Sequence, residues 1–383
     1  MIGELRYEAY PDLGRLDPEQ WVTLFAGLPD SLAMMQCIQR CGIEGFTFLT
    51  LIVWMGTRPI LVLPLFGTEY RLSTLVDGAL QTILRAAERW LGRWLRPRML
   101  GVGLVEAEWG QVGCDPQADR ATLGRAWDVA LRGLRTLAAQ RRIDVLAFVN
   151  FTAESGRNLP LHKLADFTAM PGPPYGCVPI VHDSTEAYLA SLSHKMRGNL
   201  RRALRKARVV ERRHTRDPGP WLDRIYAWYL ETVRRSGQAF SVPPRAYFAD
   251  VCRAVPGAEY VLYFLDDRCI AFSLVVVTPD ALVDKYFGME ADIGRQYSLY
   301  FVSTYDNISY CIDHRIPLYD AGQWAEETKT RFGVTFRPSS ILFKHRRPWC
   351  HWLLTRLARH VSYRSNVDVT PARLGGDWEP SCI

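Results

Sequence analysis

Apolar and polar positions follow the same order of patterns twice along the chain. The first half contains a helical pattern, two apolar runs around a turn at Gly56-Thr57, a helix, a strand, a helix and a strand. These predicted elements occupy 17–41, 46–55 with 59–67, 78–95, 99–109, 119–140 and 144–151. The two apolar runs around the turn predict a β-hairpin.

The second half repeats this order. Three helices precede a hairpin around Asp266-Asp267, a strand, a polar loop, a helix and a short strand. They occupy 184–210, 219–235, 243–253, 259–277, 281–289, 291–297, 298–313 and 316–322. A segment rich in Pro and Gly at 171–179 marks the join. The sequence therefore predicts a mixed α/β fold of two tandem units, 1–170 and 171–345, followed by a tail at 346–383.

Composition is typical of a folded globular protein. Of 383 residues, 48% are apolar and 23% are charged, which argues against a disordered or fibrous chain. No window supplies the roughly 18 uncharged apolar residues of a membrane-spanning helix, and the acidic opening does not resemble a secretory signal. Nine scattered cysteines form no Cys/His cluster of zinc spacing. We expect a cytoplasmic protein with reduced thiols and no metal site.

Charge is concentrated in two basic islands. The net charge of +7 arises from segments 195–216 and 344–364, which carry +9 and +6, so the remainder of the chain is acidic. The first island is a helical pattern with an apolar stripe, and its other faces are basic. Such a helix is either a solvated surface or a binding site for a polyanion.

Two segments carry a resemblance to a known family. The basic helix SLSHKMRGNLRRALRKAR at 191–208 and the segment YDAGQWAEETKTRFG at 319–333 resemble motifs of GNAT-fold acyltransferases of the FemAB and BioF2-like branch. The family's closing motif corresponds here to Asp320, Gly322, Lys329 and Gly333. The resemblance is strongest over 184–345, and it implies two GNAT-like units in one chain, the first of them non-catalytic.

The resemblance also implies direct transfer of an acyl group to an amine in a cleft of the second unit. Backbone groups along 281–289 would polarise the acyl carbonyl. The candidate catalytic residues are Asp320, Lys329, Tyr319 and Asp284. The candidates for binding the donor are Arg295, Gln296, Tyr297, Ser298, Arg201, Arg205 and Arg331, and those for the acceptor are Tyr286, Glu290 and Tyr300.

Each candidate has a plainer interpretation. Asp320 would suit a helix cap near Gln323, and Ser298 would cap the helix at 298–313. Lys329 stands three residues after Glu326, and Arg331 stands four residues after Glu327, which are the spacings of surface ion pairs. Spacing alone favours these structural roles, and the family resemblance favours the functional ones.

The sequence leaves three interpretations of the function: two classes of donor and a protein without catalysis. A thioester of CoA or of the phosphopantetheine arm of a carrier protein is narrowly favoured as co-substrate, with no permanently bound cofactor. The run 294–298 has a single glycine, which weakens the match to a pyrophosphate-binding loop. Aminoacyl-tRNA is the alternative donor, and tRNA or a carrier protein would bind the 195–216 helix. A third interpretation is a non-catalytic module that binds an anionic polymer.

The second basic island also has two interpretations. Two tryptophans lie among leucines and arginines in 344–364, and a similar cluster surrounds Trp90 and Trp94. Packing of the indole rings into the core is the commoner outcome for such residues. The other interpretation is peripheral contact with the inner face of a membrane, because amphipathic aromatic and basic helices bind there.

Overall fold

The computed structural model describes residues 4–26, 31–74, 78–107, 109–236, 240–323 and 326–358. The chain divides into two compact units. Among the described residues, unit 1 comprises those up to Pro174 together with Pro338–Ala358, and unit 2 comprises Tyr175–Arg337. Residues 338–345, which the sequence placed in the second unit, thus belong to unit 1. The reason is a β-ladder, because Ser340–His345 pair with Val145–Phe151 of unit 1.

Unit 1 is built on a mixed sheet. Its strands are β1 (Leu5–Tyr10), β2 (Phe46–Met55), β3 (Arg58–Glu69), β4 (Arg98–Val102), β6 (Val145–Phe151) and β13 (Thr335–His345), in that spatial order. The short β5 (Gly113–Cys114) pairs with β3. Neighbours are antiparallel except β4 and β6, which are parallel.

Five helices complete unit 1 among the described residues: α1 (Pro18–Leu24), α2 (Leu32–Cys41), α3 (Gly78–Leu91), α4 (Arg120–Gln140) and α12 (Pro348–Ala358). Helix α4 begins at the N-cap Asp119, whose carboxylate accepts a hydrogen bond from the Thr122 amide. Its apolar face buries Ala126, Trp127 and Leu134 against the sheet. The core of unit 1 therefore lies between α4 and the β1–β3 strands.

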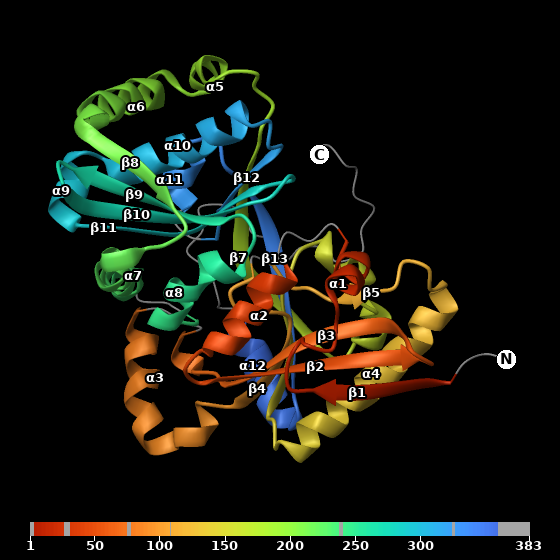
Figure 1. Cartoon of the computed structure of the whole chain (residues 1–383). Helices are drawn as coiled ribbons and strands as arrows, with labels where there is room; N and C mark the ends of the chain where they lie inside the picture. The colour runs from red at the N-terminus through yellow and green to blue at the C-terminus, as the bar shows by residue number, and fades with distance from the viewer. Residues whose placement is uncertain are drawn as a thin grey trace. The chain divides into compact units, whose positions relative to one another are not determined.

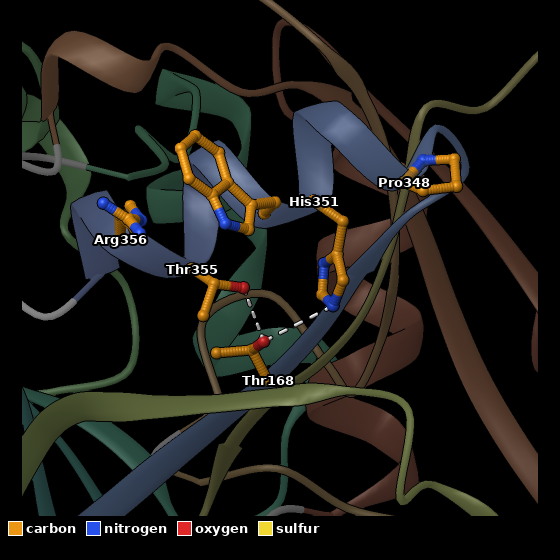
Figure 2. A pocket seen from close by; sticks show the side chains of 6 residues that line it. Thr168, Pro348, His351, Thr355 and Arg356 are labelled. Atoms are coloured by element: carbon orange, nitrogen blue, oxygen red, sulfur yellow. Dashed lines mark hydrogen bonds between the residues drawn. The ribbon is translucent and has the colours of Figure 1, made fainter.

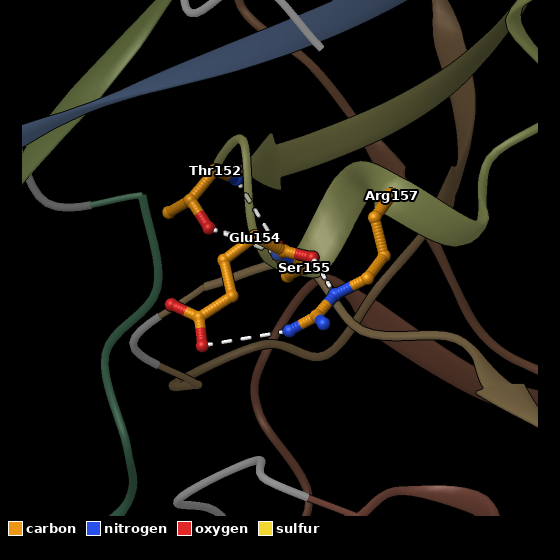
Figure 3. A network of polar contacts seen from close by, with 4 residues as sticks. All are labelled: Thr152, Glu154, Ser155 and Arg157. Carbon is orange, nitrogen blue, oxygen red and sulfur yellow. Dashed lines mark hydrogen bonds and ion pairs between the residues drawn. The ribbon is translucent and has the colours of Figure 1, made fainter. Parts of the chain in front are cut away.

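Short 3₁₀ turns link the longer elements of unit 1: η1 (Leu72–Thr74), η2 (Gly92–Trp94), η3 (Ser155–Asn158) and η4 (Leu161–Lys163). After β6, the Thr152 and Ser155 hydroxyls exchange hydrogen bonds with each other's backbone amides (Figure 3). Arg157 donates to the Glu154 carbonyl and pairs with its carboxylate. This network ends β6 with a tight turn that satisfies its own backbone groups.

Unit 2 repeats the strand order of unit 1. Its sheet contains the part of β7 (Thr168–Pro179) from Tyr175 onward, together with β12 (Leu318–Gly322), β11 (Leu282–Met289), β10 (Arg268–Val277), β9 (Ala258–Leu265) and β8 (Val210–Thr215). Strands β8 to β11 are antiparallel neighbours, β11 and β12 are parallel, and β12 and β7 are antiparallel. Hairpin, strand, helix and parallel strand thus recur, as the sequence pattern predicts.

The helices of unit 2 cover both faces of this sheet. They are α5 (Thr185–Ser191), α6 (His194–Lys206), α7 (Leu222–Ser236), α8 (Arg245–Ala254), α9 (Ala291–Gln296), α10 (Leu299–Asp313) and α11 (Glu326–Thr330), with 3₁₀ turns η5 (Ala207–Val209) and η6 (Gly219–Trp221). Helices α6 and α10 pack on one face, and α7 and α8 lie on the other (Figure 1). Met196 and Leu200 of α6 are buried on the α10 side.

The Pro/Gly-rich segment 171–179 contains the boundary between the two units, and it is part of strand β7, because proline favours extended backbone and Gly176–Pro179 pair with β12. Several other local predictions are wrong. The polar loop at 291–297 is helix α9 over most of its length. The predicted helix 184–210 is broken between α5 and α6 by the extended backbone of Leu192. Strands β1, β5, β8 and β13 are short or polar, and their patterns gave no clear signal.

Candidate active site

The central feature of unit 2 is a fork between two parallel strands. β11 and β12 pair at only two positions, Leu282 with Tyr319 and Val283 with Asp320. β11 continues beyond this point and stays paired with β10 as far as Met289. Its other edge is no longer paired with β12, so its backbone groups can bind a ligand there.

A β-bulge alters the direction of β11 at the fork. Leu274 faces Tyr286 and Val275 faces Asp284, which leaves Lys285 as the extra residue of β11. β12 ends at Gly322, which has the left-handed φ of 69° that glycine adopts without strain. The bulge and the glycine together separate the two strands immediately after their paired segment.

Asp284 occupies the start of the fork. The Tyr319 hydroxyl donates a hydrogen bond of 2.8 Å to Oδ2 of Asp284, and the Ser273 hydroxyl donates one of 3.5 Å to Oδ1. Tyr319 and Ser273 are buried, whereas Asp284 is half-buried. Residues of β10 and β12 thus hold a carboxylate that remains partly accessible.

Two tyrosines around this carboxylate remain protonated at neutral pH. Burial, followed by the charge of Asp284, raises the pKa of Tyr319 well above its ordinary value of 10. Burial and the same carboxylate also raise the pKa of Tyr300. Both hydroxyls therefore keep their protons, and that of Tyr319 donates to the Asp284 carboxylate.

Asp320 and Lys329 brace the end of β12. The buried Asp320 accepts a hydrogen bond of 2.8 Å from the Gly322 amide through Oδ1. Lys329 donates from Nζ to the carbonyl oxygen of Ala321. Helix α11 begins at Glu326, so the cap expected near Gln323 is not formed there. These contacts fix the connection between β12 and α11.

Comparison with known proteins bears on this fold. Residues 194–330 match a family model described as an acetyltransferase (GNAT) domain. The structure is similar to that of FemX, with 12% identity over 91% of this chain and 100% of that chain and a TM-score of 0.57. A tandem GNAT protein from the clavulanic acid biosynthesis pathway gives 14% identity, coverage of 90% and 99%, and a TM-score of 0.51. The chain has a FemAB-like tandem GNAT fold.

A further similar structure is that of L-PGS from Bacillus licheniformis, with 10% identity, coverage of 95% of this chain and 100% of that chain, and a TM-score of 0.51. No sequence among curated proteins matches. The tandem GNAT fold and the mixed α/β class predicted from the sequence are thus confirmed. The matched segment 194–330 contains the fork, Asp284 and Lys329.

Within this tandem GNAT fold, the predicted donor-binding residues are distributed over separate surfaces. Arg295 pairs with Asp292 within α9 at 2.8 Å, and Gln296 is exposed beside it. Tyr297 packs partly against the α6 side of the core. Ser298 stands at the N-cap of α10 with φ 54°, and its side chain makes no capping hydrogen bond. The amides at the start of α10 therefore donate no hydrogen bond to the Ser298 side chain.

Arg201 and Arg205 are exposed on α6, where they belong to a basic surface. Lys195, Arg201, Arg202, Arg205, Lys206 and Arg208 are exposed there, and none joins an ion pair with another of the described residues. Arg331, by contrast, pairs with Glu327 at 2.6 Å, as its four-residue spacing indicated.

The predicted acceptor residues have other neighbours too. Tyr286 packs against the rings of Tyr229, Tyr247 and Phe248 on the α7–α8 face. Arg268 binds both carboxylate oxygens of Glu290 at 2.6 Å. Tyr300 lies within electrostatic reach of Asp284, because burial and then the charge of Asp284 raise its pKa. The structure therefore gathers Asp284, Tyr319 and Tyr300 and leaves Tyr286 and Glu290 in separate contacts.

Two members of the cluster were not predicted from the sequence. Ser273 is the one hydroxyl in the apolar run CIAFSLVVV of β10, and it is fully buried. Asn307 of α10 is 4% exposed and lies close enough to Tyr319 to oppose the rise in the pKa of its hydroxyl. A polar residue within a buried apolar pattern was the available signal, because such a group needs a buried partner.

Two further kinds of feature are absent from the part of the chain that the structure describes. No group of three or more His, Cys, Asp or Glu side chains there could hold a metal ion. Among the same residues, no helix has the length and apolarity needed to cross a membrane.

Proposed function

We propose that this protein transfers an acyl group from a thioester to an acceptor amine by direct attack at the fork of unit 2. The observation that carries this proposal is the separation of β11 from β12 directly beside a hydrogen-bonded, partly accessible carboxylate. An acyltransferase needs a group that polarises the carbonyl and a group that takes the amine proton. We assign these two needs to the backbone of β11 beyond its pairing with β12 and to the Asp284 carboxylate.

In the proposed reaction the amine nitrogen attacks the thioester carbonyl carbon. A C–N bond forms, the C–S bond breaks, and the proton lost by the amine passes to Asp284, which then returns it to the leaving thiolate. Backbone amides along β11 bind the carbonyl oxygen as it gains negative charge. Tyr319 is a positioning residue, because its buried hydroxyl acts on Asp284 and not on the substrate.

A CoA or carrier-protein thioester suits the start of α10. The amides there donate no hydrogen bond to the Ser298 side chain, and the N-termini of helices bind phosphate oxygens. The similar tandem GNAT protein is described as a form without AcCoA, which associates that protein with acetyl-CoA. We extend this class of donor to the present chain as a proposal. Such donors are cytoplasmic, which agrees with the compartment expected from the sequence.

Aminoacyl-tRNA is the second candidate donor, and the basic surface of α6 favours it. Six exposed cationic side chains along α6 and η5 form no ion pair with other described residues, so this surface can bind a long polyanion. An acidic carrier protein would bind the same surface by the same attraction. Incubation with each donor separately distinguishes these candidates.

Mass spectrometry of transfer products tests the proposal. The protein is incubated separately with acyl-CoAs, acyl-loaded carrier protein and charged tRNA, each with a mixed pool of amines. We expect an amide product from a thioester donor. A product formed only with charged tRNA and lost after ribonuclease treatment would replace the donor by aminoacyl-tRNA. Transfer from none of them would support a non-catalytic anion-binding module.

A further inference from the structure

Unit 1 has a face on which large apolar side chains are exposed. Trp90 is 90% exposed, and Trp94, Trp349 and Trp352 are 53%, 56% and 57% exposed. Leu353 at 54% and Ile83 at 61% extend the same set. The sequence favoured burial of these tryptophans, and the structure corrects this. Exposed aromatic residues that gather in one place usually mark a binding surface.

The tryptophans come from two segments that meet within unit 1. The rings of Trp94 in η2 and Trp349 in α12 lie 5.4 Å apart between centroids. Trp349, Trp352, Leu353 and Arg356 stand at steps of three and four, so they share one side of α12. This side is exposed, whereas Cys350 and Ala358 of the same helix are buried. We call the combined surface the tryptophan face.

The tryptophan face is also cationic. The Arg347 guanidinium lies 5.0 Å from the ring centre of Trp94, and that of Arg356 lies 4.1 Å from the ring centre of Trp352. Arg89, Arg347 and Arg356 are exposed and join no ion pair among the described residues. The acidic residue of the adjoining α3 segment, Glu88, is buried and bound to Ser73 and Arg96. Asp166, which lies near His351, is paired with Lys344, so the exposed charge on this face that joins no ion pair among the described residues is that of the three arginines.

A pocket of about 410 Å³ lies along α12 at the same face. Thr168, Pro348, His351, Trp352, Thr355 and Arg356 line it. The Thr168 hydroxyl binds the Thr355 hydroxyl at 2.8 Å and approaches Nε2 of His351 at 3.4 Å (Figure 2). Hydroxyls, an imidazole and a guanidinium beside an indole ring form a site of suitable size and chemistry for a phosphate-bearing headgroup.

From these observations we propose that the tryptophan face docks unit 1 onto a membrane surface that contains anionic lipids. Indole rings favour the boundary between headgroups and acyl chains, and arginines near an anionic surface add electrostatic attraction. A second copy of the chain fits less well. A symmetric dimer through this face would oppose arginine with arginine, because both partners use the same surface. The proposal is independent of the proposed reaction at the fork.

Co-sedimentation with vesicles tests this docking. The full-length protein is mixed with vesicles of phosphatidylcholine alone or of phosphatidylcholine with equal phosphatidylglycerol. We expect binding to the anionic vesicles that weakens strongly at about 1 M salt, where the screening length falls to about 3 Å. Binding to neither vesicle, or equal binding to both, would overturn the proposal.

Two variants locate the contact. Arg89→Gln/Arg347→Gln/Arg356→Gln should lower the partition coefficient about 100-fold, at about fivefold for each arginine. Trp90→Ala/Trp94→Ala/Trp349→Ala/Trp352→Ala should lower it on the order of 100-fold, because binding scales with buried apolar area. Because the replaced arginines and tryptophans are exposed, both variants should still fold, and thermal unfolding checks this.

The matched control removes the same charge from the other basic island. Arg201→Gln/Arg205→Gln/Arg208→Gln should leave vesicle binding within a few-fold of that of the unsubstituted protein. An equal loss in both arginine variants would overturn the proposal by showing a general electrostatic attraction. If the tryptophan variant instead abolishes a concentration-dependent dimer seen by sedimentation, and vesicles bind neither protein, the face is an interface between copies.

Discussion

Units 1 and 2 share an order of strands but differ where the parallel strands meet. In unit 1, β4 and β6 pair at four positions, from Met99 with Val145 to Val102 with Phe148. In unit 2, β11 and β12 pair at two. Beyond the segment of β6 that pairs with β4, the amide of Gly110 donates a hydrogen bond of 2.8 Å to the Asn150 carbonyl of β6. Another part of unit 1 therefore fills the position that stays open in unit 2.

Close packing explains why the first fork is closed. A Cβ at Gly110 would lie 2.2 Å from the Val149 carbonyl oxygen and 2.5 Å from the Phe151 ring. No carboxylate takes the place that Asp284 holds in unit 2, since β4 ends at Val102 and continues into Gly103. One topology thus provides either a fork beside a carboxylate or a closely packed core, depending on which residues follow the paired strands.

The largest expected effect follows from removing the carboxylate at the open fork. Asp284→Asn retains the shape and the Tyr319 contact but cannot accept a proton. We expect kcat/KM for acyl transfer to fall by about 10²–10⁴, the usual contribution of general acid–base catalysis. Initial rates with the productive donor measure this.

The control for Asp284 is a carboxylate of unit 1. Asp128 pairs with Lys163 on the exposed side of α4. Asp128→Asn should leave kcat/KM within twofold, because exposed ion pairs contribute little. Rates that are unaffected by Asp284→Asn would remove the proposed base.

The second prediction concerns the closed fork. Gly110→Ala places a methyl group in the 2.2 Å contact with Val149, and overpacking of this kind costs about 1–3 kcal/mol. Chemical denaturation should show a lower free energy of unfolding, and acyl transfer per folded molecule should be unchanged.

Gly124→Ala is the matched glycine control. Gly124 lies in α4, and a Cβ there meets nothing within 4 Å. This change should stabilise the helix by about 0.5–1 kcal/mol. If both alanine variants shift stability in the same direction, the sealed packing around Gly110 is not as described.

The third prediction uses tyrosines buried in unit 2. Burial raises the pKa values of Tyr188, Tyr263, Tyr300 and Tyr319. Above about pH 10 the unfolded chain ionises first, so stability present below this pH is lost as the pH rises. Each tyrosine should remove about 1.4 kcal/mol of unfolding free energy per pH unit. Denaturation between pH 9 and about 11 measures the slope.

Tyr263→Phe should reduce the loss of unfolding free energy at alkaline pH by the contribution of one tyrosine, about 1.4 kcal/mol per pH unit. Tyr263 is fully buried, and phenylalanine retains its packing without an ionisable group. An unchanged slope in this variant would show that Tyr263 ionises as readily in the folded protein as in the unfolded chain.

The smallest expected effect tests whether Lys329 stabilises the fold or takes part in catalysis. Lys329→Met removes the bond to the Ala321 carbonyl and should cost about 1 kcal/mol of stability, with a change in rate of a few-fold. Arg331→Gln breaks only the exposed pair with Glu327 and should cost about 0.5 kcal/mol or less. A large loss of kcat in Lys329→Met without loss of stability would restore a catalytic role to Lys329.

Much of the fold follows from periodicity alone. Long apolar runs such as those of β2, β3, β9 and β10 bury both faces, and the turn residues between them identify the two hairpins. The amphipathic helices α4 and α10 are equally clear. Strand β7 was hidden by its prolines and β8 by its charges, because pairing with neighbouring strands overrides local propensity.

The site was only partly predictable. Asp284, Tyr319 and Tyr300 were named from strand ends and a family motif, and the structure brings them together. Arg295 and Glu290 have nearby partners of opposite charge instead, Asp292 and Arg268. Such a pairing across 22 residues, as between Arg268 and Glu290, depends on strand register, which no local pattern specifies.

The sequence by itself determined the repeated α/β order, the two basic islands and the residues able to carry acyl-transfer chemistry, because periodicity and side-chain type are local properties. Only the tertiary structure decided which fork stays open, that residues 338–345 complete unit 1, and that four tryptophans are exposed instead of buried. These outcomes depend on the register of strands and on packing between segments distant in sequence. The interactions that set them exist only once the chain has folded.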